Sequence, residues 1–288
     1  MYKILEKEQL NASVAKMVVE APFVAKKAEP GQFIILRVDE DGERVPFTIA
    51  DFDREKNTVT IIYQIVGAET ARLNMKQAGD YLHDFVGPLG NATKTEGYKK
   101  VAVIGGGVGT AIAYPVAKKF FNNGTEVHTI VGFRNKDLVI LEDEFKACSN
   151  KYVLVSDDGS TGKQGFVTDA LKELIEAGEN YDLVIAIGPL PMMKFVSKLT
   201  KEYGIKTVVS MNPIMIDGTG MCGGCRLTVG GETKFACVDG PEFDGHKVDF
   251  DLAMKRQQMY KTEEGRALLK LQEGDTHHGG CGQCGGDK

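Results

Sequence analysis

The sequence predicts an all-β region followed by an α/β region, in which an antiparallel β-barrel precedes a parallel sheet with helices on both faces. Two observations support this fold class. Up to residue 97, short β-rich segments alternate with turn residues, which is typical of an antiparallel barrel or sandwich. From residue 98, apolar strands alternate with helical segments, which indicates a doubly wound parallel sheet. A smaller region, rich in glycine and cysteine, begins near residue 213.

The bulk properties are those of an ordinary globular protein. The 288 residues exceed the usual size of one domain, and the hydrophobic content of 42% is typical. A net charge of −5 gives no reason to expect nucleic acid or an anionic membrane as a partner. Charged residues from Lys3 onward interrupt any signal-peptide pattern. Six clustered cysteines argue against a secreted disulfide framework, so we expect a cytoplasmic protein.

The longest uncharged run extends from Val101 to Ala117 and reaches the lower limit of membrane-spanning length. It contains three consecutive glycines and Pro115, which fit a strand, a loop and a helix better than a membrane span. We therefore expect no membrane association.

These changes of pattern divide the chain into four expected parts. The parts are a β-barrel at residues 1–97, an α/β domain at 98–212, a cysteine segment at 213–250, and a C-terminal helix with a flexible Gly/Cys/His tail at 251–288. In the barrel, strands are expected at 14–20, 33–38 and 58–65. In the α/β domain, strands are expected at 101–104, 127–131, 152–155, 183–187 and 207–210. Helices are expected from the glycine-rich turn to residue 122 and at 137–148, 165–177, 192–203 and 250–271.

A glycine-rich turn, Gly105-Gly106-Gly107-Val108-Gly109, follows the first strand of the α/β domain and begins a helix. Glycines here let the backbone approach a diphosphate, whose charge the helix N-terminus stabilises. The second strand ends at Phe133-Arg134 and lacks the usual ribose-binding acid. Asp157 and Asp158, after the third strand, are alternative ribose contacts, while Arg134 would favour a 2′-phosphate. The turn predicts dinucleotide binding and leaves the choice between NAD and NADP open.

Two segments of the barrel could contact a flavin nucleotide. The segment from Arg44 to Ala50 places an arginine, an aromatic ring and a hydroxyl on one expected strand. Arginine pairs with phosphate, and hydroxyl or backbone groups can hydrogen-bond a flavin ring. The segment from Gly67 to Thr70 could begin a helix that binds a phosphate. Taken alone, each is better explained as a solvated strand or a plain turn.

Three of the six cysteines lie in the pattern Asp217-x4-Cys222-x2-Cys225-x11-Cys237. The plant-type ferredoxin spacing for a [2Fe–2S] cluster is C-x4-C-x2-C with a distant fourth cysteine, so aspartate stands in the first position here. The alternatives are free buried thiols and a structural zinc site, although zinc sites usually pair two such motifs. The C-terminal tail adds four residues of unassigned role: His277, His278, Cys281 and Cys284.

Together, these segments resemble the ferredoxin-reductase-type flavoproteins over nearly the whole chain. The most similar members are the electron-transfer subunit of dihydroorotate dehydrogenase and the small subunit of NADH-dependent reduced ferredoxin:NADP⁺ oxidoreductase, an electron-bifurcating enzyme. The order and spacing of six segments carry this resemblance: Arg44-x-Pro46-Phe47-Thr48-Ile49, Tyr63-Gln64-Ile65-Val66-Gly67-x-x-Thr70, Gly87-Pro88-Leu89-Gly90-Asn91, Gly105-Gly106-Gly107-x-Gly109, Asp157-Asp158-Gly159-Ser160 and Cys237-x-Asp239-Gly240-Pro241.

The resemblance implies an FAD-binding barrel, an NAD(P)-binding domain and a [2Fe–2S] segment. It assigns FAD to Arg44, Pro46, Phe47, Thr48, Ile49, Gln64, Gly67 and Thr70. It assigns the dinucleotide, expected to be NAD(H), to Gly105, Gly106, Gly107, Gly109, Asp157 and Asp158. It assigns the cluster to Asp217, Cys222, Cys225 and Cys237.

The same resemblance implies an oxidoreductase subunit that exchanges electrons with NAD(H) through FAD and the cluster. It would form a hetero-oligomer with a larger subunit containing flavin and [4Fe–4S] clusters, and would act on ferredoxin indirectly. The resembling dihydroorotate dehydrogenase subunits carry cysteine where Asp217 stands, and the bifurcating small subunits carry aspartate, which favours electron bifurcation. The alternatives are a dihydroorotate dehydrogenase subunit, a sulfide or polysulfide reductase subunit, and a zinc-binding interaction module. No side chain is expected to act as a catalytic acid or base.

Overall fold

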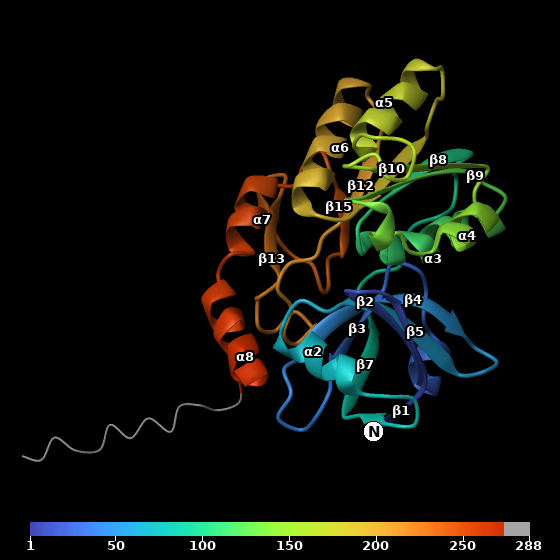
Figure 1. Ribbon diagram of the computed structural model, residues 1–288. Coiled ribbons are helices and arrows are strands. Elements are labelled where there is room, and N and C mark those ends of the chain that lie inside the picture. The colour runs from blue at the N-terminus through green and yellow to red at the C-terminus, as the bar shows by residue number, and fades with distance from the viewer. Residues whose placement is uncertain (274–288) are drawn as a thin grey trace, which may run out of the picture.

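The computed structural model describes residues 1–273, and the four tail residues named above lie outside this range. The first part is a seven-stranded antiparallel sheet, coloured blue to cyan in Figure 1. Its order is β6-β1-β2-β5-β4-β3-β7, and only His83 separates the two outermost strands in sequence, so the sheet curls back on itself into a near-closed barrel. The strands are β1 (Tyr2–Asn11), β2 (Val14–Glu20), β3 (Phe33–Arg37), β4 (Val45–Asp53), β5 (Thr58–Gln64), β6 (Tyr81–Leu82) and β7 (Asp84–Leu89).

Alternating side chains fill the barrel. Val59, Ile61 and Tyr63 of β5 are all buried in one core with Ile34 and Leu36 of β3. This spacing of two is what a strand with one face toward a core requires. Two short helices, α1 (Pro22–Ala25) and α2 (Ala68–Met75), lie between strands of this part.

The second part is a six-stranded sheet of order β10-β9-β8-β11-β12-β15, in which only β15 runs antiparallel to its neighbour. Its strands are β8 (Lys100–Gly106), β9 (Glu126–Phe133), β10 (Lys151–Ser156), β11 (Leu183–Ile187), β12 (Thr207–Ser210) and β15 (Glu242–Asp244). The helices are α3 (Gly109–Asn122), the 3₁₀ helix η1 (Lys136–Leu138), α4 (Glu142–Ala147), α5 (Val167–Glu176) and α6 (Leu190–Glu202).

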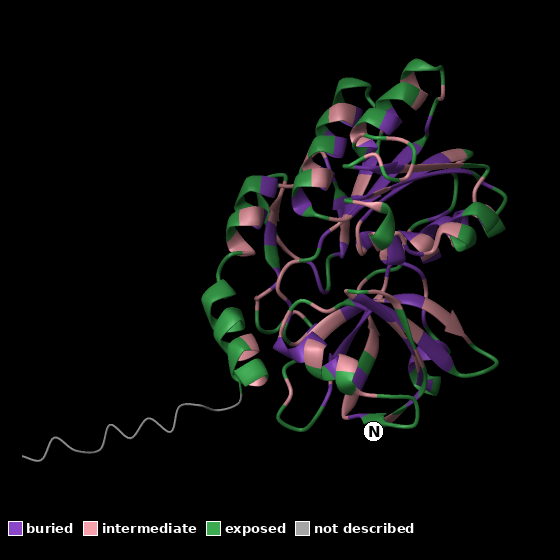
Figure 2. Ribbon diagram, in the orientation of Figure 1, coloured by how far each residue is buried: buried purple, intermediate pink, exposed green. Residues whose placement is uncertain are grey.

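Both faces of this sheet are covered. Val101 and Val103 of β8 pack with Phe120 of α3, whereas Ala102 and Ile104 belong to the core under α5 and α6. Figure 2 shows the strands buried between these helical layers. The continuous apolar run along β8 therefore reflects burial of both faces of the sheet, as expected for a parallel sheet. The predicted fold class is confirmed.

The cysteine segment follows β12 and contains a small hairpin, β13 (Arg226–Val229) with β14 (Glu232–Phe235). The chain then adds β15 to the edge of the large sheet. Two helices end the described chain, α7 (Phe250–Arg256) and α8 (Lys261–Glu273). They run down one side of the molecule in Figure 1, and α8 contacts α2 of the barrel. Among residues 1–273, no helix combines the length and apolar character needed to cross a bilayer.

Two predicted helices were wrong in extent. The helix expected at 137–148 is split into η1 and α4, because Ile140 turns into the core and Leu141 adopts a left-handed φ of 57°. The single helix expected at 250–271 is split at residues 257–260. Helix α7, which has an apolar buried face, ends there. Helix α8 begins after it and has no buried residue.

An ion pair joins the barrel to the α/β part. Lys118 Nζ of α3 lies 3.0 Å from Asp51 Oδ2 of β4. Helix α3 starts at the glycine-rich turn, and β4 carries the expected flavin contacts, so this pair ties together the elements that bear the two expected binding regions.

Candidate functional site

A cleft of about 1540 Å³ lies between the barrel and the carboxyl ends of the parallel strands. Its walls include Pro46, Thr48 and Gln64 from the barrel, and Gly106 and Gly107 from the turn after β8. Ligands of doubly wound sheets bind at this edge. An ordinary small-molecule pocket measures roughly 300–1,000 Å³. The cleft therefore has room for more than one nucleotide cofactor.

The residues expected on β4 divide between two faces. Pro46 and Thr48 line the cleft, whereas Phe47 and Ile49 are buried in the barrel core, where the Phe47 ring lies 5.7 Å from that of Tyr63. This follows from the alternation of side chains along a strand. Phe47 and Ile49 thus support the wall from behind. Just before β4, Arg44 is exposed and makes no side-chain hydrogen bond or ion pair with any residue in the described range.

Gly67 and Thr70 form the start of α2, where a phosphate site was expected. The Thr70 hydroxyl accepts hydrogen bonds from the backbone N–H groups of Val66 and Gly67, both at 3.0 Å, and donates to the Gly67 carbonyl. The side chain is therefore already used to shape the turn. A phosphate at this helix would be bound by backbone N–H groups. Neither residue is among those that line the large cleft.

The glycine-rich turn leaves its backbone open to the cleft at one position and is closely packed at the others. An added Cβ would lie 2.9 Å from Thr110 at Gly105, 2.4 Å from the Met192 sulfur at Gly106 and 2.6 Å from the Ile187 carbonyl at Gly109. Gly107 has a φ of 54° and nothing within 4 Å of such an atom. A diphosphate can therefore approach the backbone at Gly107. These residues fit a dinucleotide.

The adjacent acids Asp157 and Asp158 have different roles. Asp157 lines the cleft, and its carboxylate makes no hydrogen bond within residues 1–273. The Asp158 carboxylate accepts hydrogen bonds from the Ser160 hydroxyl at 2.6 Å and from the Ser160 backbone N–H at 2.9 Å, which lower the pKa of Asp158. Of these two acids, Asp157 is the one that lines the cleft and can accept a ribose hydroxyl there. Arg134, the opposing candidate, lines the same cleft.

Sequence reasoning missed part of the cleft wall. Pro189 and Met192 follow β11, and Phe166 precedes α5, with its ring exposed. The first two could have been found, because they follow an apolar strand whose carboxyl end lies beside that of β8. No comparable sequence pattern marked Phe166 as part of the cleft.

The four expected cluster ligands lie in one segment as two pairs. The sulfur atoms of the buried Cys225 and Cys237 are 3.2 Å apart, and both residues are free cysteines. Asp217 is joined to the exposed Cys222, whose backbone N–H donates to Asp217 Oδ2 at 2.6 Å. Four donors in one segment agree in number with the four protein ligands of a [2Fe–2S] cluster. The donor set, three soft thiols and one carboxylate, therefore fits iron.

The Asp217 carboxylate also organises the loop. Its Oδ1 accepts hydrogen bonds from the Thr219 hydroxyl, at 2.6 Å, and from the Thr219 backbone. Hydrogen bonds from Cys222 and Thr219 hold the pKa of Asp217 far below its usual value. The carboxylate is thus ionised, as a metal ligand must be.

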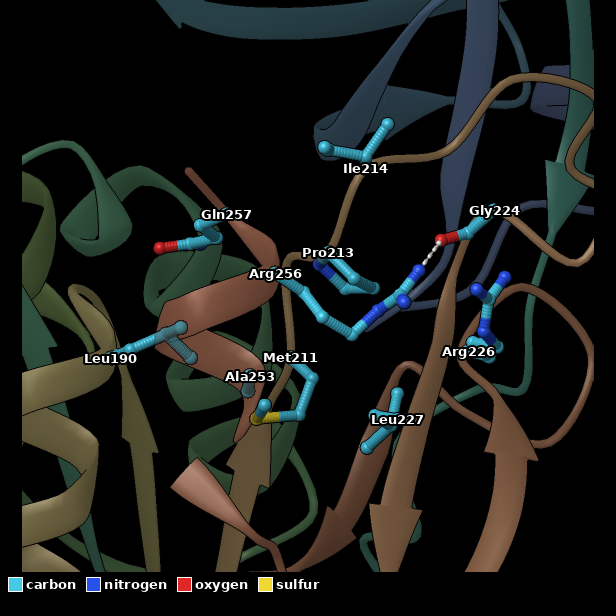
Figure 3. Close-up of a pocket in the computed structure, with 10 residues that line it drawn as sticks. All are labelled: Leu190, Met211, Pro213, Ile214, Gly224, Arg226, Leu227, Ala253, Arg256 and Gln257. Carbon is cyan, nitrogen blue, oxygen red and sulfur yellow. Dashed lines mark hydrogen bonds between the residues drawn. The ribbon is translucent and has the colours of Figure 1, made fainter. Parts of the chain in front are cut away.

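A second cavity lies between α7 and the cysteine segment, as Figure 3 shows. Its volume is about 20 Å³. A space of roughly 10–15 Å³ holds one water molecule, so this cavity is too small for a cofactor. Arg256 and Leu227 are among the residues that line it.

Comparison with known proteins identifies two domains. Residues 212–249 match the iron–sulfur cluster binding domain of dihydroorotate dehydrogenase B, and residues 103–198 match an oxidoreductase NAD-binding domain. The first match contains all four expected cluster ligands and favours an iron–sulfur cluster over zinc. The second contains the glycine-rich turn and Asp157.

Whole-chain relatives agree. The chain is 45% identical to a homolog of the dihydroorotate dehydrogenase B electron transfer subunit from Thermotoga maritima, over 91% of this chain and 92% of that one. It is 35% identical to the dihydroorotate dehydrogenase B electron transfer subunit of Fusobacterium nucleatum, over 85% and 96%. A structure from work on flavin-based electron bifurcation by NADH-dependent reduced ferredoxin–NADP oxidoreductase superposes with a TM-score of 0.89 and 43% identity, covering 94% of this chain and 98% of that one.

A more distant structure shows the fold alone. A ferredoxin NADP⁺ reductase from Neisseria gonorrhoeae superposes with a TM-score of 0.58 at 16% identity. The order of barrel, nucleotide sheet and cluster segment, together with the two domain matches and the whole-chain relatives, places the chain in one family. The chain belongs to the family of dihydroorotate dehydrogenase B electron transfer subunits, as an electron-transfer oxidoreductase subunit with FAD-, NAD- and iron–sulfur-binding parts.

Proposed function

We propose that this chain is the small subunit of an electron-bifurcating enzyme that couples NADH and reduced ferredoxin to NADP⁺. The observation that supports the proposal is the similarity to the oxidoreductase structure, which has a TM-score of 0.89 and 43% sequence identity over 94% of this chain, whereas the Fusobacterium dihydroorotate dehydrogenase subunit is 35% identical. Asp217 in the first ligand position agrees with it, because the resemblance implies aspartate there in the bifurcating small subunits. The partner would be a larger subunit with a flavin and [4Fe–4S] clusters.

The chain's own residues would bind and align the cofactors. Pro46, Thr48 and Gln64 would line the flavin side of the cleft, and Arg44 is a free cation for a phosphate. Phe47 and Ile49 would hold that wall in place from the barrel core, and Gly67 and Thr70 would shape a helix start for a second phosphate contact. On the opposite wall, the turn Gly105-Gly106-Gly107-Val108-Gly109 would bind the diphosphate and Asp157 the ribose of NAD(H).

This arrangement brings the nicotinamide and flavin regions into one cleft. When bound, FAD supplies a group that accepts a hydride and gives up its electrons singly, and a [2Fe–2S] cluster carries one electron at a time. Asp217, Cys222, Cys225 and Cys237 would hold the cluster. The barrel and the nucleotide sheet then act by positioning and by excluding water.

The test is to isolate the native complex without oxygen and to determine its cofactors and partner. We expect FAD and a two-iron cluster in this chain, a larger partner with a second flavin and [4Fe–4S] clusters, and NADPH-dependent reduction of ferredoxin that requires NAD⁺. A partner containing FMN, with NAD⁺-dependent oxidation of dihydroorotate, would contradict the proposal and support the dihydroorotate dehydrogenase reading.

A further inference from the structure

Helix α7 begins at Phe250, immediately beyond the end of the matched cluster-binding domain at residue 249, and packs directly on the cluster segment. Phe250 and Ala253 are buried in the same apolar core as Cys225 and Cys237. The helix therefore shares its packing with two of the proposed ligands. No role for α7 follows from the family match.

Several contacts that do not involve Arg256, the last residue of α7, hold this helix against the rest of the protein. The Asp249 carboxylate accepts a hydrogen bond from the backbone N–H of Leu252 at 2.9 Å, which caps the helix N-terminus. Lys194 of α6 lies 2.7 Å from Asp251. With the buried face of the helix, these contacts fix its position. A change at Arg256, the final residue, should leave the helix in place.

The Arg256 side chain extends from the end of α7 to the cluster loop. Its Nη2 donates a hydrogen bond to the Gly224 carbonyl at 3.2 Å, drawn as a dashed line in Figure 3. Gly224 lies between the proposed ligands Cys222 and Cys225. Arg256 is half-buried, whereas the neighbouring Lys255 is exposed. The contact is thus partly shielded from water, where a charge acts more strongly.

A second arginine holds the preceding carbonyl. Arg226, at the start of β13, donates from Nη1 to the Gly223 carbonyl at 3.1 Å. The same peptide unit directs its N–H group, that of Gly224, at the Cys222 sulfur, 3.4 Å away. Two guanidinium groups from different elements therefore bind two successive carbonyls of the loop between Cys222 and Cys225.

We propose that Arg256, assisted by Arg226, is a positioning residue that holds this loop against α7 and makes the cluster easier to reduce. The inference rests on the proposed cluster ligands. Hydrogen bonds to ligand sulfur and nearby positive charge both stabilise the reduced cluster, which carries one more negative charge. Arg226 polarises the peptide that donates to the Cys222 sulfur, and Arg256 fixes the next peptide. Helix α7 thereby raises the reduction potential of the cluster without contacting the glycine-rich turn.

The test compares Arg256→Gln, Arg256→Lys and the control Lys255→Gln in the anaerobically purified complex. Lys255→Gln removes the same charge one residue away, from an exposed side chain that makes no hydrogen bond to the loop within residues 1–273. The readouts are the cluster midpoint potential, followed by EPR, and the rate at which a chelator removes iron. For Arg256→Gln we expect a more negative midpoint potential and severalfold faster iron loss. A tenfold fall in the equilibrium constant for one-electron reduction of the cluster corresponds to a shift of about 59 mV. Arg256→Lys should lie between this variant and the wild type, and Lys255→Gln should match the wild type.

The possible failures are distinguishable. A wild-type potential and a wild-type rate of iron loss in Arg256→Gln would overturn this inference and leave the proposed function intact. Equal shifts in Arg256→Gln and Lys255→Gln would also overturn it, since they would show a general charge effect. Wild-type protein without iron would overturn the ligand assignment and this inference together.

Discussion

The sulfur atoms of Cys225 and Cys237 lie 3.2 Å apart although twelve positions separate them in the chain. The hairpin β13–β14 explains this closeness, because it fills the interval and pairs Arg226 with Phe235 across its open end. One cysteine precedes the first strand and the other follows the second. The eleven-residue spacing is therefore the length of a hairpin with its connections, and it brings the two thiols side by side.

Replacing Cys225 with serine should abolish the cluster or make it severely unstable. Cys225 is buried beside Cys237, and serine is a poor substitute for a soft thiolate ligand of iron. Iron and acid-labile sulfide per chain, measured after anaerobic purification, should fall to a small fraction of the wild-type value, while bound flavin is retained. Cys148→Ser is the matched control, since Cys148 is also buried but packs against α3 and α4 in another core. Iron near the wild-type content in the Cys225 variant would refute the ligand assignment.

Asp217→Cys should keep the cluster and change its potential. Thiolate is the usual ligand at this position in ferredoxin-type sites and donates more charge than carboxylate. The substitution also removes the acceptor for Thr219 and for the Cys222 backbone, so the loop should loosen. We expect full iron content, a shifted midpoint potential in an EPR-monitored titration, and electron transfer to the partner impaired more than NADH binding. An unchanged potential together with unchanged coupled activity would contradict this prediction, because it would show that the aspartate determines neither property.

Much of the fold could be predicted because its signals are local. The run from Val101 to Ile104 is apolar at every position, since one side faces α3 and the other faces α5 and α6. The contributions of individual site residues could not be predicted so well. Phe47 and Ile49 were expected to contact FAD along with Thr48, but which face of β4 meets the cleft depends on how the barrel closes.

The same limit applies to pairs of residues distant in sequence. The contact of Arg256 with Gly224 depends on where α7 docks, and no local pattern reports that. The addition of β15 to the sheet edge likewise arises after the chain has passed through the whole cluster segment. By contrast, the Asp158–Ser160 turn is local, and an Asp two residues before a Ser near glycines is a recognisable turn signal.

Asp157→Ala should weaken NADH binding and reduce the preference for NAD over NADP. The Asp157 carboxylate lines the cleft and has no hydrogen-bond partner among residues 1–273, so it can accept ribose hydroxyls and would repel a 2′-phosphate near Arg134. A hydrogen bond to a charged group contributes about 1.5–3 kcal/mol, so KM for NADH should rise roughly tenfold to a hundredfold. Steady-state reduction of an artificial acceptor by NADH and by NADPH measures both effects.

Asp158→Ala provides the comparison for Asp157→Ala. Because Asp158 Oδ1 is bonded to Ser160 and Asp158 is not among the residues that line the cleft, its loss should change the ratio of NADH to NADPH activity much less. A larger change in this ratio for the Asp158 variant would reverse the assignment of the two acids.

Glu242 should make the stability of the fold depend on pH near neutrality. Burial raises the pKa of this β15 carboxyl from 4.5 to about 7, and its Oε1 accepts a hydrogen bond from Thr93 at 2.6 Å. Between these pH values the folded state holds a proton that the unfolded chain has released, so the free energy of unfolding falls as the pH rises through this window. Glu242→Gln should remove this dependence and raise the melting temperature at pH 8 more than at pH 5, when both proteins are compared anaerobically with cofactors bound. The exposed Glu232→Gln serves as the control, and equal pH profiles for wild type and Glu242→Gln would show that Glu242 does not titrate in this range.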